Sequence, residues 1–273
     1  GGFSDYILWR FQAKVNDGWI VKREGKSPPR VNDFRSASVP GALDKLKVCD
    51  VDGRDLQGET LEDYQGLMER ELRDARGATT LVIGDGVNNQ TSTARTREML
   101  STNTFWTQCW SALTLLTKGG TFICQVTDSI GRCMSGSAFL LTGCFERVTI
   151  IKPATTCPAK SKRFLICLNF KGQDDECVKL VRQHLYQALS TSAKAKSEGK
   201  GHDVVEIVPW PHINAVGKEF INNMVKLNER DLGQEASAIK SIKDRDVSMS
   251  AARIYAAELQ RLGFEVNGPQ PSG

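Results

Sequence analysis

The chain has 273 residues, enough for one large domain or for a domain with a smaller appendage. Hydrophobic residues make up 40% of it and charged residues 25%, as in most globular proteins. No apolar run approaches the roughly 20 residues that a membrane span needs, so no membrane partner is expected. The formal net charge of +4 permits a polyanionic partner without requiring one. Because the chain begins with Gly-Gly rather than Met, we expect a fragment or a processed piece.

The cysteines indicate a reduced, intracellular protein. There are eight of them, with no C-x-x-C pair, and the three histidines stand at no ligand spacing to them. Cys124 and Cys167 lie inside apolar runs, where a free thiol behaves as a small core residue. The sequence therefore predicts neither a disulfide scaffold nor a metal site.

Apolar and polar patterning predicts alternating strands and helices in the first two thirds of the chain. Predicted helices cover residues 3–11, 59–74, 93–117, 135–143 and 174–189, and predicted strands cover 18–21, 46–51, 79–84, 121–126, 148–151 and 163–168. The helix at 93–117 should end at Gly119-Gly120. It carries one apolar stripe, made of Phe105, Cys109, Ala112, Leu113 and Leu116. Strand 163–168 should pair back on 148–151 as a hairpin. This order predicts an α/β domain with a largely parallel sheet.

The last third of the chain has a different composition and pattern. Residues 190–202 are rich in Ser, Lys and Gly and suggest a linker or an exposed loop. Residues 203–273 read as a helical extension, whose last helix has Ala251, Tyr255, Leu259 and Leu262 along one face before Gly263. The predicted organisation is thus a domain over 1–189, a linker over 190–202 and the extension over 203–273.

Strand 79–84 is the element most closely tied to function. It is a short apolar run of the kind that is buried on both faces in parallel sheets, and it leads directly into Asp85 between two glycines. Ligands of open α/β sheets bind beyond the carboxyl ends of such strands. Asp85 is therefore a candidate functional carboxylate, with glycines that let a ligand approach the backbone. A simple turn in which Asp85 bonds locally explains the stretch equally well.

Three further stretches are candidates for binding. Gly1-Gly2 before a helix is suited to a ligand carboxylate, although such a pair often only makes a turn. Acidic residues around Asp55 could bind hydroxyls or an amine, or simply be solvated. The stretch from 151 to 163 carries four cations that could hold a phosphate backbone, or be an ordinary solvated loop: Lys152, Lys160, Lys162 and Arg163.

Taken together, these motifs show a resemblance to a known family. Residues 1–10, 84–86, 119–124 and 144–148 resemble the FtsJ-like (RrmJ-type) ribose 2′-O-methyltransferases, and within them most closely the branch that acts on the mRNA cap. Residues 152–167 are similar to that family's last hairpin. Residues 207–229 are similar to the helical C-terminal extension of the cap branch. The likeness covers nearly the whole chain.

The resemblance implies a Rossmann-like, seven-stranded fold that uses S-adenosylmethionine and methylates the ribose 2′-hydroxyl beside a 7-methylguanosine cap. It also implies capped mRNA as substrate, the transcription or capping machinery as a further partner, and a nuclear location. The family's cofactor loop is represented here only by Gly1 and Gly2. In the family this loop follows the first strand in sequence order, which lies at the middle of the sheet. That strand is therefore expected to be missing from the chain.

The family's catalytic tetrad is Lys-Asp-Lys-Glu, and the resemblance carries it over only in part. Asp85 keeps the aspartate, Gln125 stands at the second lysine, and Lys162 stands at the glutamate; the first lysine would lie upstream of Gly1. Gln125 is neutral and cannot accept a proton, and Lys162 reverses a charge.

The remaining assignments carried over from the family concern ligand contacts. Asp55 and Asp85 would contact the cofactor, and Asn228 the cap. Two functions stay open: an impaired cap-type methyltransferase, or a catalytically dead fold that binds RNA or a partner. A third reading, a truncated gene product, predicts no stable fold.

Overall fold

The computed structural model describes residues 18–23, 46–51, 72–84, 94–126, 131–153, 156–159, 162–197, 204 and 206–243. The chain divides into two compact units, 1–76 with 187–203 and 77–186 with 204–273. In the first unit β1 (Gly18–Arg23) and β2 (Leu46–Val51) pair in parallel, with Gly18 opposite Leu46. Both strands were predicted at these places.

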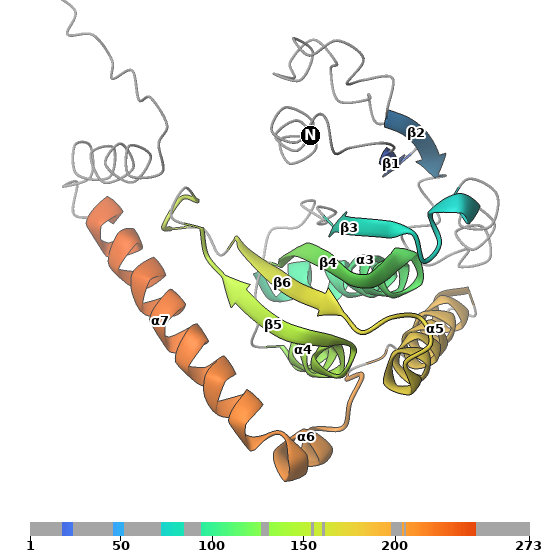
Figure 1. The fold of residues 1–273 in the computed structure, drawn as a ribbon. Coiled ribbons are helices and arrows are strands. Elements are labelled where there is room, and N and C mark those ends of the chain that lie inside the picture. The colour runs from blue at the N-terminus through green and yellow to red at the C-terminus, as the bar shows by residue number, and fades with distance from the viewer. Residues whose placement is uncertain are drawn as a thin grey trace, which may run out of the picture. The chain divides into compact units, whose positions relative to one another are not determined.

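The second unit is built on a four-stranded sheet, drawn in Figure 1. Its strands are β3 (Thr79–Gly84), β4 (Leu116–Val126), β5 (Phe145–Ile151) and β6 (Arg163–Phe170), in the order β3-β4-β6-β5. β3 and β4 are parallel, and β6 is antiparallel to both of its neighbours. The α/β fold class and the β5–β6 hairpin are therefore confirmed. The sheet is mixed rather than largely parallel, because the hairpin reverses β6 and inserts it between β4 and β5.

β3 is less deeply buried than the sequence predicts. Leu81, Val82 and Ile83 are half-buried, and among the described strands β3 pairs only with β4. The resemblance implies seven strands in one sheet, whereas the described residues form six strands in two separate sheets. The prediction that this strand is buried on both faces is wrong for the described part of the chain.

Two helices cover one face of the sheet. α3 (Ala94–Leu115) packs on β3 and β4, and α4 (Arg132–Cys144) packs on β5 and β6. The predicted stripe is confirmed, since each of its five residues is at most 5% exposed. The two helices also share a buried hydrogen bond, in which Trp106 Nε1 donates to Ser137 Oγ over 2.9 Å. Burial is not confined to the stripe, because nearly every residue of α3 from Phe105 to Leu115 is buried.

α3 ends earlier than predicted, at Leu115, and β4 begins at once. The helix needs no glycine stop, because the side-chain amide of Gln173 donates to the carbonyls of Leu113, Thr114 and Leu116. Gly119-Gly120 lies inside β4 instead. Gly119 has φ +82°, and the pairing of β3 with β4 shifts register there. The glycine pair therefore makes a strand irregularity rather than a helix terminator.

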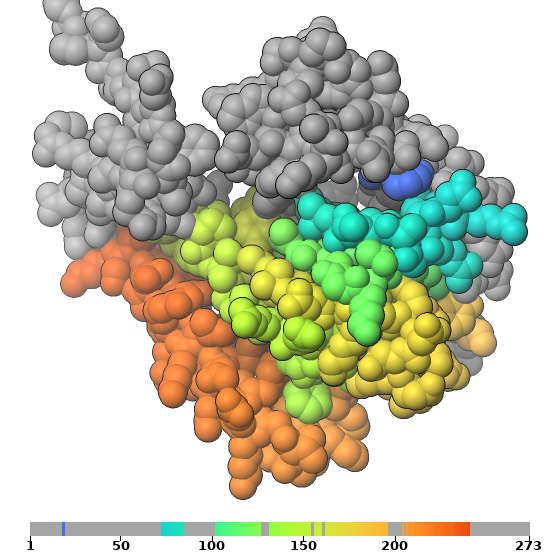
Figure 2. Space-filling model, in the orientation of Figure 1, coloured from blue at the N-terminus to red at the C-terminus, as the bar shows by residue number. Residues whose placement is uncertain are grey.

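The C-terminal helices belong to the second unit. α6 (Trp210–Val216) and α7 (Lys218–Lys243) follow a short segment that contacts α4 at Cys133 and Gly136. Both helices lie at the surface in Figure 2. The rings of Phe139 and Phe220 meet edge to face, with centroids 5.4 Å apart. Gly217 lies so close to Phe139 that a Cβ at this position would be 2.9 Å from a ring carbon. The predicted helical extension is confirmed as far as Lys243, and the helix predicted beyond residue 250 lies outside the described residues.

α5 (Glu176–Ser197) extends past the predicted domain boundary. It was predicted to end at residue 189, and the additional turns replace the first part of the predicted linker. The predicted helix at 3–11 lies outside the described residues, and of the one at 59–74 only the last residues are described, where 73–75 form a 3-10 turn. No helix among the described residues is long and apolar enough to cross a membrane.

Candidate functional site

The candidate site lies where β3 and β4 end and β6 begins. In the sheet register Gly84 is opposite Cys124, Gln125 is opposite Phe164, and Val126 is opposite Arg163. Asp85 is outside the described residues, but it follows Gly84 directly in the chain. Pairing between strands far apart in sequence thus brings Gln125 and Lys162 to the edge at which β3 also ends. We call Gly84, Gln125, Lys162 and Phe164 the candidate edge.

Side chains of β4 alternate between the two faces at this edge. Cys124 is buried and its Sγ donates to Gln108 Oε1 of α3 over 2.9 Å, so Gln125 faces away from α3. Gln125 is half-buried. A Cβ on Gly84 would collide with the Gln108 side chain and lie 3.0 Å from Cys124 Sγ. The glycine at position 84 was predicted to let a ligand approach the backbone. In the structure it is explained by close packing against α3.

Lys162 lies on the same face as Gln125. It is half-buried, and its Nζ is 5.3 Å from the centroid of the Phe164 ring, which is a cation–π contact. Phe164 is itself opposite Gln125. The candidate edge therefore presents one neutral amide and one ammonium group. These groups can orient a hydroxyl and attract a phosphate, but neither is a carboxylate.

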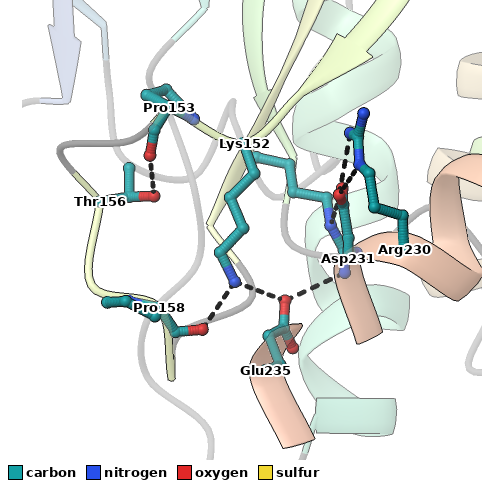
Figure 3. A network of polar contacts seen from close by, with 8 residues as sticks. Lys152, Pro153, Thr156, Pro158, Arg230, Asp231 and Glu235 are labelled. Atoms are coloured by element: carbon teal, nitrogen blue, oxygen red, sulfur yellow. Dashed lines mark hydrogen bonds and ion pairs between the residues drawn. The ribbon is translucent and has the colours of Figure 1, made fainter. Parts of the chain in front are cut away.

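Arg163 and Lys152 belong to a separate cluster with Asp231 and Glu235 of α7. Figure 3 labels Lys152, Asp231 and Glu235 in this cluster. Arg163 Nε lies 3.1 Å from Asp231 Oδ2, and Arg163 Nη2 lies 3.0 Å from Glu235 Oε1. Lys152 Nζ donates to the same Glu235 oxygen over 3.0 Å. The Nε contact is an ion pair without hydrogen-bond geometry, since Nε has no hydrogen-bond acceptor. We call Lys152, Arg163, Asp231 and Glu235 the ionic cluster.

The ionic cluster is buried and nearly balanced in charge. The side chains of Arg163 and Asp231 are 1% and 2% exposed, and that of Lys152 is 6% exposed. Arg230 adds an exposed cation 2.9 Å from Asp231 Oδ1. Removing one partner of such a buried pair typically costs about 3–5 kcal/mol, because the other charge is left uncompensated. The cluster therefore attaches α7 to the ends of β5 and β6.

The connection between β5 and β6 is held by the same contacts. Besides Glu235, Lys152 Nζ binds the carbonyl oxygen of Pro158 over 2.8 Å. Thr156 closes a turn onto the carbonyl of Pro153, through its hydroxyl at 2.7 Å and its amide at 2.9 Å. Two of the four cations predicted to bind RNA thus have their charge engaged inside the protein. An RNA contact by Lys152 or Arg163 stays a prediction, and one that this geometry does not favour.

Asp231 and Glu235 are the residues that sequence reasoning missed. They stand four apart on an amphipathic helix, which places both carboxylates on one side of it. That spacing could have marked them as partners for a basic element. It could not have shown which cations they meet, because the cations that bind Glu235 lie 72 and 83 residues away in the chain.

The other predicted residues fall as follows. Asn228 is on α7 and half-buried. Gly1, Gly2, Asp55, Asp85 and Lys160 lie outside the described residues, so their assigned roles stay predictions. The described residues contain no group of three or more His, Cys, Asp and Glu side chains that could hold a metal ion.

Four of the cysteines are core residues, which confirms the prediction made for Cys109, Cys124 and Cys167 and adds Cys144. Cys109, Cys124, Cys144 and Cys167 are fully buried and carry free thiols. Burial raises the pKa of the Cys144 thiol to about 12, with the neighbouring Cys177 adding to the rise. Burial likewise raises the pKa of Cys109 and Cys167. Thiols of this kind stay protonated and are poor nucleophiles.

Comparison with known proteins finds a methyltransferase family and relatives named as methyltransferases. Residues 1–170 match the family model described as FtsJ-like methyltransferase. A Danio rerio protein named cap-specific mRNA (nucleoside-2′-O-)-methyltransferase 1 is 28% identical over 262 residues, which are 93% of this chain and 30% of that protein. A Caenorhabditis briggsae protein named inactive cap-specific mRNA (nucleoside-2′-O-)-methyltransferase 1B is 26% identical over 229 residues, 84% of this chain and 26% of that protein. The chain thus spans less than a third of either relative.

A solved structure of a ribosomal RNA methyltransferase from Plasmodium falciparum also overlaps this chain. It covers 63% of this chain and 82% of its own, at 18% identity and a TM-score of 0.45. A similarity this low does not define a site.

Proposed function

Because this chain belongs to the FtsJ-like methyltransferase family, we propose that it is a ribose 2′-O-methyltransferase domain for the first transcribed nucleotide of capped mRNA, working at a strongly reduced rate. Proteins of this family generally use S-adenosylmethionine, which would supply an electrophilic methyl group for the 2′-oxygen. The names of the relatives support capped mRNA as the substrate. A nuclear location and a partner in the transcription or capping machinery belong to the same proposal.

The observation that carries the reduced rate is the composition of the candidate edge. A ribose hydroxyl is a very weak acid, so methylation is helped by a group that takes or shares its proton. The Gln125 amide cannot accept that proton at ordinary pH. Lys162 brings a positive charge to the position at which the resemblance implies a carboxylate, and its Nζ rests over Phe164, the residue opposite Gln125. General acid–base assistance contributes about 10²–10⁴-fold to rates, and a loss of that order is expected here.

Binding and positioning can persist without that assistance. Gln125 can still orient the hydroxyl through a hydrogen bond, and the half-buried Lys162 can attract an RNA phosphate. Asp85, together with Asp55, Gly1 and Gly2, would hold the methyl donor. Aligning the oxygen with the donor accounts for a large part of the barrier reduction in such reactions. A slow but cap-directed transfer is therefore the expected activity.

The test is methyl incorporation from labelled S-adenosylmethionine into capped RNA. The unchanged protein should give a low, cap-dependent rate, and Q125K with K162E should raise it about 10²-fold or more. A matched control is K118E, which reverses an exposed lysine at the opposite end of β4 and should leave the rate unchanged. Equal rates for the unchanged and doubly substituted proteins would contradict the role given to the candidate edge.

A second candidate function is a catalytically silent module that binds capped RNA or a protein partner. The Caenorhabditis briggsae relative named as inactive favours it. In this case capped RNA or the partner still binds, but neither the unchanged protein nor the Q125K/K162E variant transfers methyl groups. Cap-dependent turnover by the unchanged protein would exclude this alternative.

A further inference from the structure

The end of α4 and the start of α5 place a buried thiol beside an exposed one. Cys144 is the last residue of α4 and is buried, whereas Cys177 is the second residue of α5 and is exposed. The two thiols are hydrogen-bonded to each other. The Sγ atom of Cys177 also lies against the backbone of Gly143, where a Cβ would be only 2.6 Å from it. The two sulfur atoms are therefore direct neighbours, and one of them is open to solvent.

The chain between the two cysteines holds them in place. After β6, Lys171 donates its amide to the Cys144 carbonyl over 3.0 Å and its ammonium group to the Gly143 carbonyl over 2.7 Å. Asp175 then caps α5, since its carboxylate accepts a hydrogen bond from the Val178 amide over 3.1 Å. These contacts fix the end of α4 against the start of α5. A bond between the sulfur atoms thus needs only a local adjustment.

We propose that Cys144 and Cys177 are a reversible oxidation site, at which hydrogen peroxide converts the two thiols into a disulfide. Hydrogen peroxide is favoured as the oxidant because it is small and uncharged. The start of α5 carries Asp174, Asp175 and Glu176, which repel anionic oxidants such as glutathione disulfide. Disulfides inside cells are mostly transient ones of this kind. The inference does not depend on the proposed function.

The oxidation proceeds in two steps. In the first, the Cys177 sulfur loses its proton and attacks one peroxide oxygen; the S–O bond of a sulfenic acid forms, the O–O bond breaks, and the leaving hydroxide takes up a proton. In the second, the Cys144 sulfur attacks the Cys177 sulfur; the S–S bond forms, the S–O bond breaks, and the hydroxide leaves with the Cys144 proton as water. The two thiols together lose two electrons, and peroxide is reduced to two molecules of water.

Exposure and burial assign the two roles. Cys177 is open to solvent, so the oxidant reaches it first. Burial raises the pKa of the Cys144 thiol to about 12, so this thiol stays protonated and escapes direct oxidation. Its contact with Cys177 compensates for its low reactivity, because a neighbouring group in the same molecule acts at a high effective concentration. The disulfide closes a loop that contains β5 and β6, which restricts the unfolded chain and stabilises the fold.

The experiment treats the whole reduced chain with a small excess of hydrogen peroxide and then blocks the remaining thiols with N-ethylmaleimide. Tryptic peptides are analysed by mass spectrometry without reduction. Peptide 133–147, which carries Cys144, should be joined to peptide 172–179, which carries Cys177. Dithiothreitol should separate them. The oxidised protein should melt at a higher temperature than the reduced protein.

Four variants identify the pair. C177S should lose both the joined peptide and the rise in melting temperature, and it leaves the core intact because Cys177 is exposed. C144A should lose both as well, and its Cys177 should accumulate as a sulfenic acid that dimedone labels. The C177S result is sufficient by itself if C144A does not fold. C157S is the matched control, since Cys157 is also exposed, and C133S is a second one, since Cys133 shares a tryptic peptide with Cys144. Neither control should change the result.

Three results would overturn the proposal. The first is oxidation of Cys177 to a sulfinic acid in the unchanged protein without any joined peptide. The second is a joined peptide that disappears in C133S or that forms between two chains, because Cys177 would then have another partner. The third is the same set of joined peptides when the oxidation is carried out in urea, because the pairing would then not come from the folded contact.

Discussion

The candidate edge and the ionic cluster lie at the same end of the sheet and treat neighbouring cations in opposite ways. Lys162 and Arg163 are adjacent in the chain, yet Lys162 lies over Phe164 whereas Arg163 is buried against Asp231 and Glu235. The cause is strand geometry, which sends successive side chains to opposite faces of a sheet. A basic stretch that enters a strand is therefore not one surface. Half of its charge serves the fold, and the other half can serve a ligand.

The largest expected effect is on the ionic cluster. R163A should lower the free energy of unfolding by about 3–5 kcal/mol, because it removes the buried cation that Asp231 and Glu235 share. Urea denaturation followed by circular dichroism measures this change. R163A combined with D231A should cost clearly less than the sum of the single changes, because both remove the same interaction. A destabilisation by R163A no greater than that by K162A would show that the cluster is not a structural tie.

A smaller effect is expected at the start of the candidate edge. G84A should destabilise the protein by about 1 kcal/mol, since the added methyl group displaces the end of the Gln108 side chain and lies 3.0 Å from Cys124 Sγ. Shortening the neighbour in G84A/Q108A should recover much of that stability. Thermal melts of the unchanged protein, G84A, Q108A and G84A/Q108A measure the interaction free energy between the two positions. Additive effects would mean that Gly84 is needed for a reason other than this contact.

The buried thiols predict a decline of stability at alkaline pH. The pKa of Cys144 is raised to about 12 from the ordinary value of 9.0. Between these values the unfolded chain releases a proton that the folded chain keeps, so ionisation favours unfolding as pH rises. For one such thiol the decline approaches about 1.4 kcal/mol per pH unit. Denaturation between about pH 8 and 10.5 should therefore show a shallower decline in C144A than in the unchanged protein, and equal declines would contradict the assignment.

The smallest effect concerns RNA. K162E, alone or with K160E, should weaken binding of capped RNA and reduce the slope of log affinity against log salt by about one for each phosphate that is no longer neutralised. Fluorescence anisotropy at several salt concentrations measures both quantities. K118E is again the control, because it changes the net charge as much as K162E but at the other end of β4. The same reduction in K118E would point to non-specific attraction.

Local sequence patterns were sufficient for most elements of the fold. The apolar stripe of α3, from Phe105 to Leu113, follows helical periodicity, and β3 to β6 follow short apolar runs, so elements and core could be predicted together. The end of α3 could not, because the cap comes from Gln173, nearly sixty residues further on. The mixed direction of the sheet depends on how the β5–β6 hairpin docks, which no single strand specifies.

The candidate site was predictable only where a motif marked it. Resemblance placed Gln125 and Lys162 at matching positions, and the register of β4 with β6 brings them to one edge. The division of labour between Lys162 and Arg163 could not be predicted, since it depends on Asp231 and Glu235 of a distant helix. Four cations in a short basic stretch look equivalent until their partners are known.

One crossed comparison tests this account most directly. K162A and R163A are each measured for the urea midpoint and for affinity to capped RNA, under conditions in which both proteins are folded. K162A should lower RNA affinity and leave the midpoint almost unchanged, whereas R163A should lower the midpoint and leave the affinity of the folded protein nearly intact. If the two variants instead decrease stability and RNA affinity in the same proportion, adjacent cations do not serve separate faces and the account is contradicted.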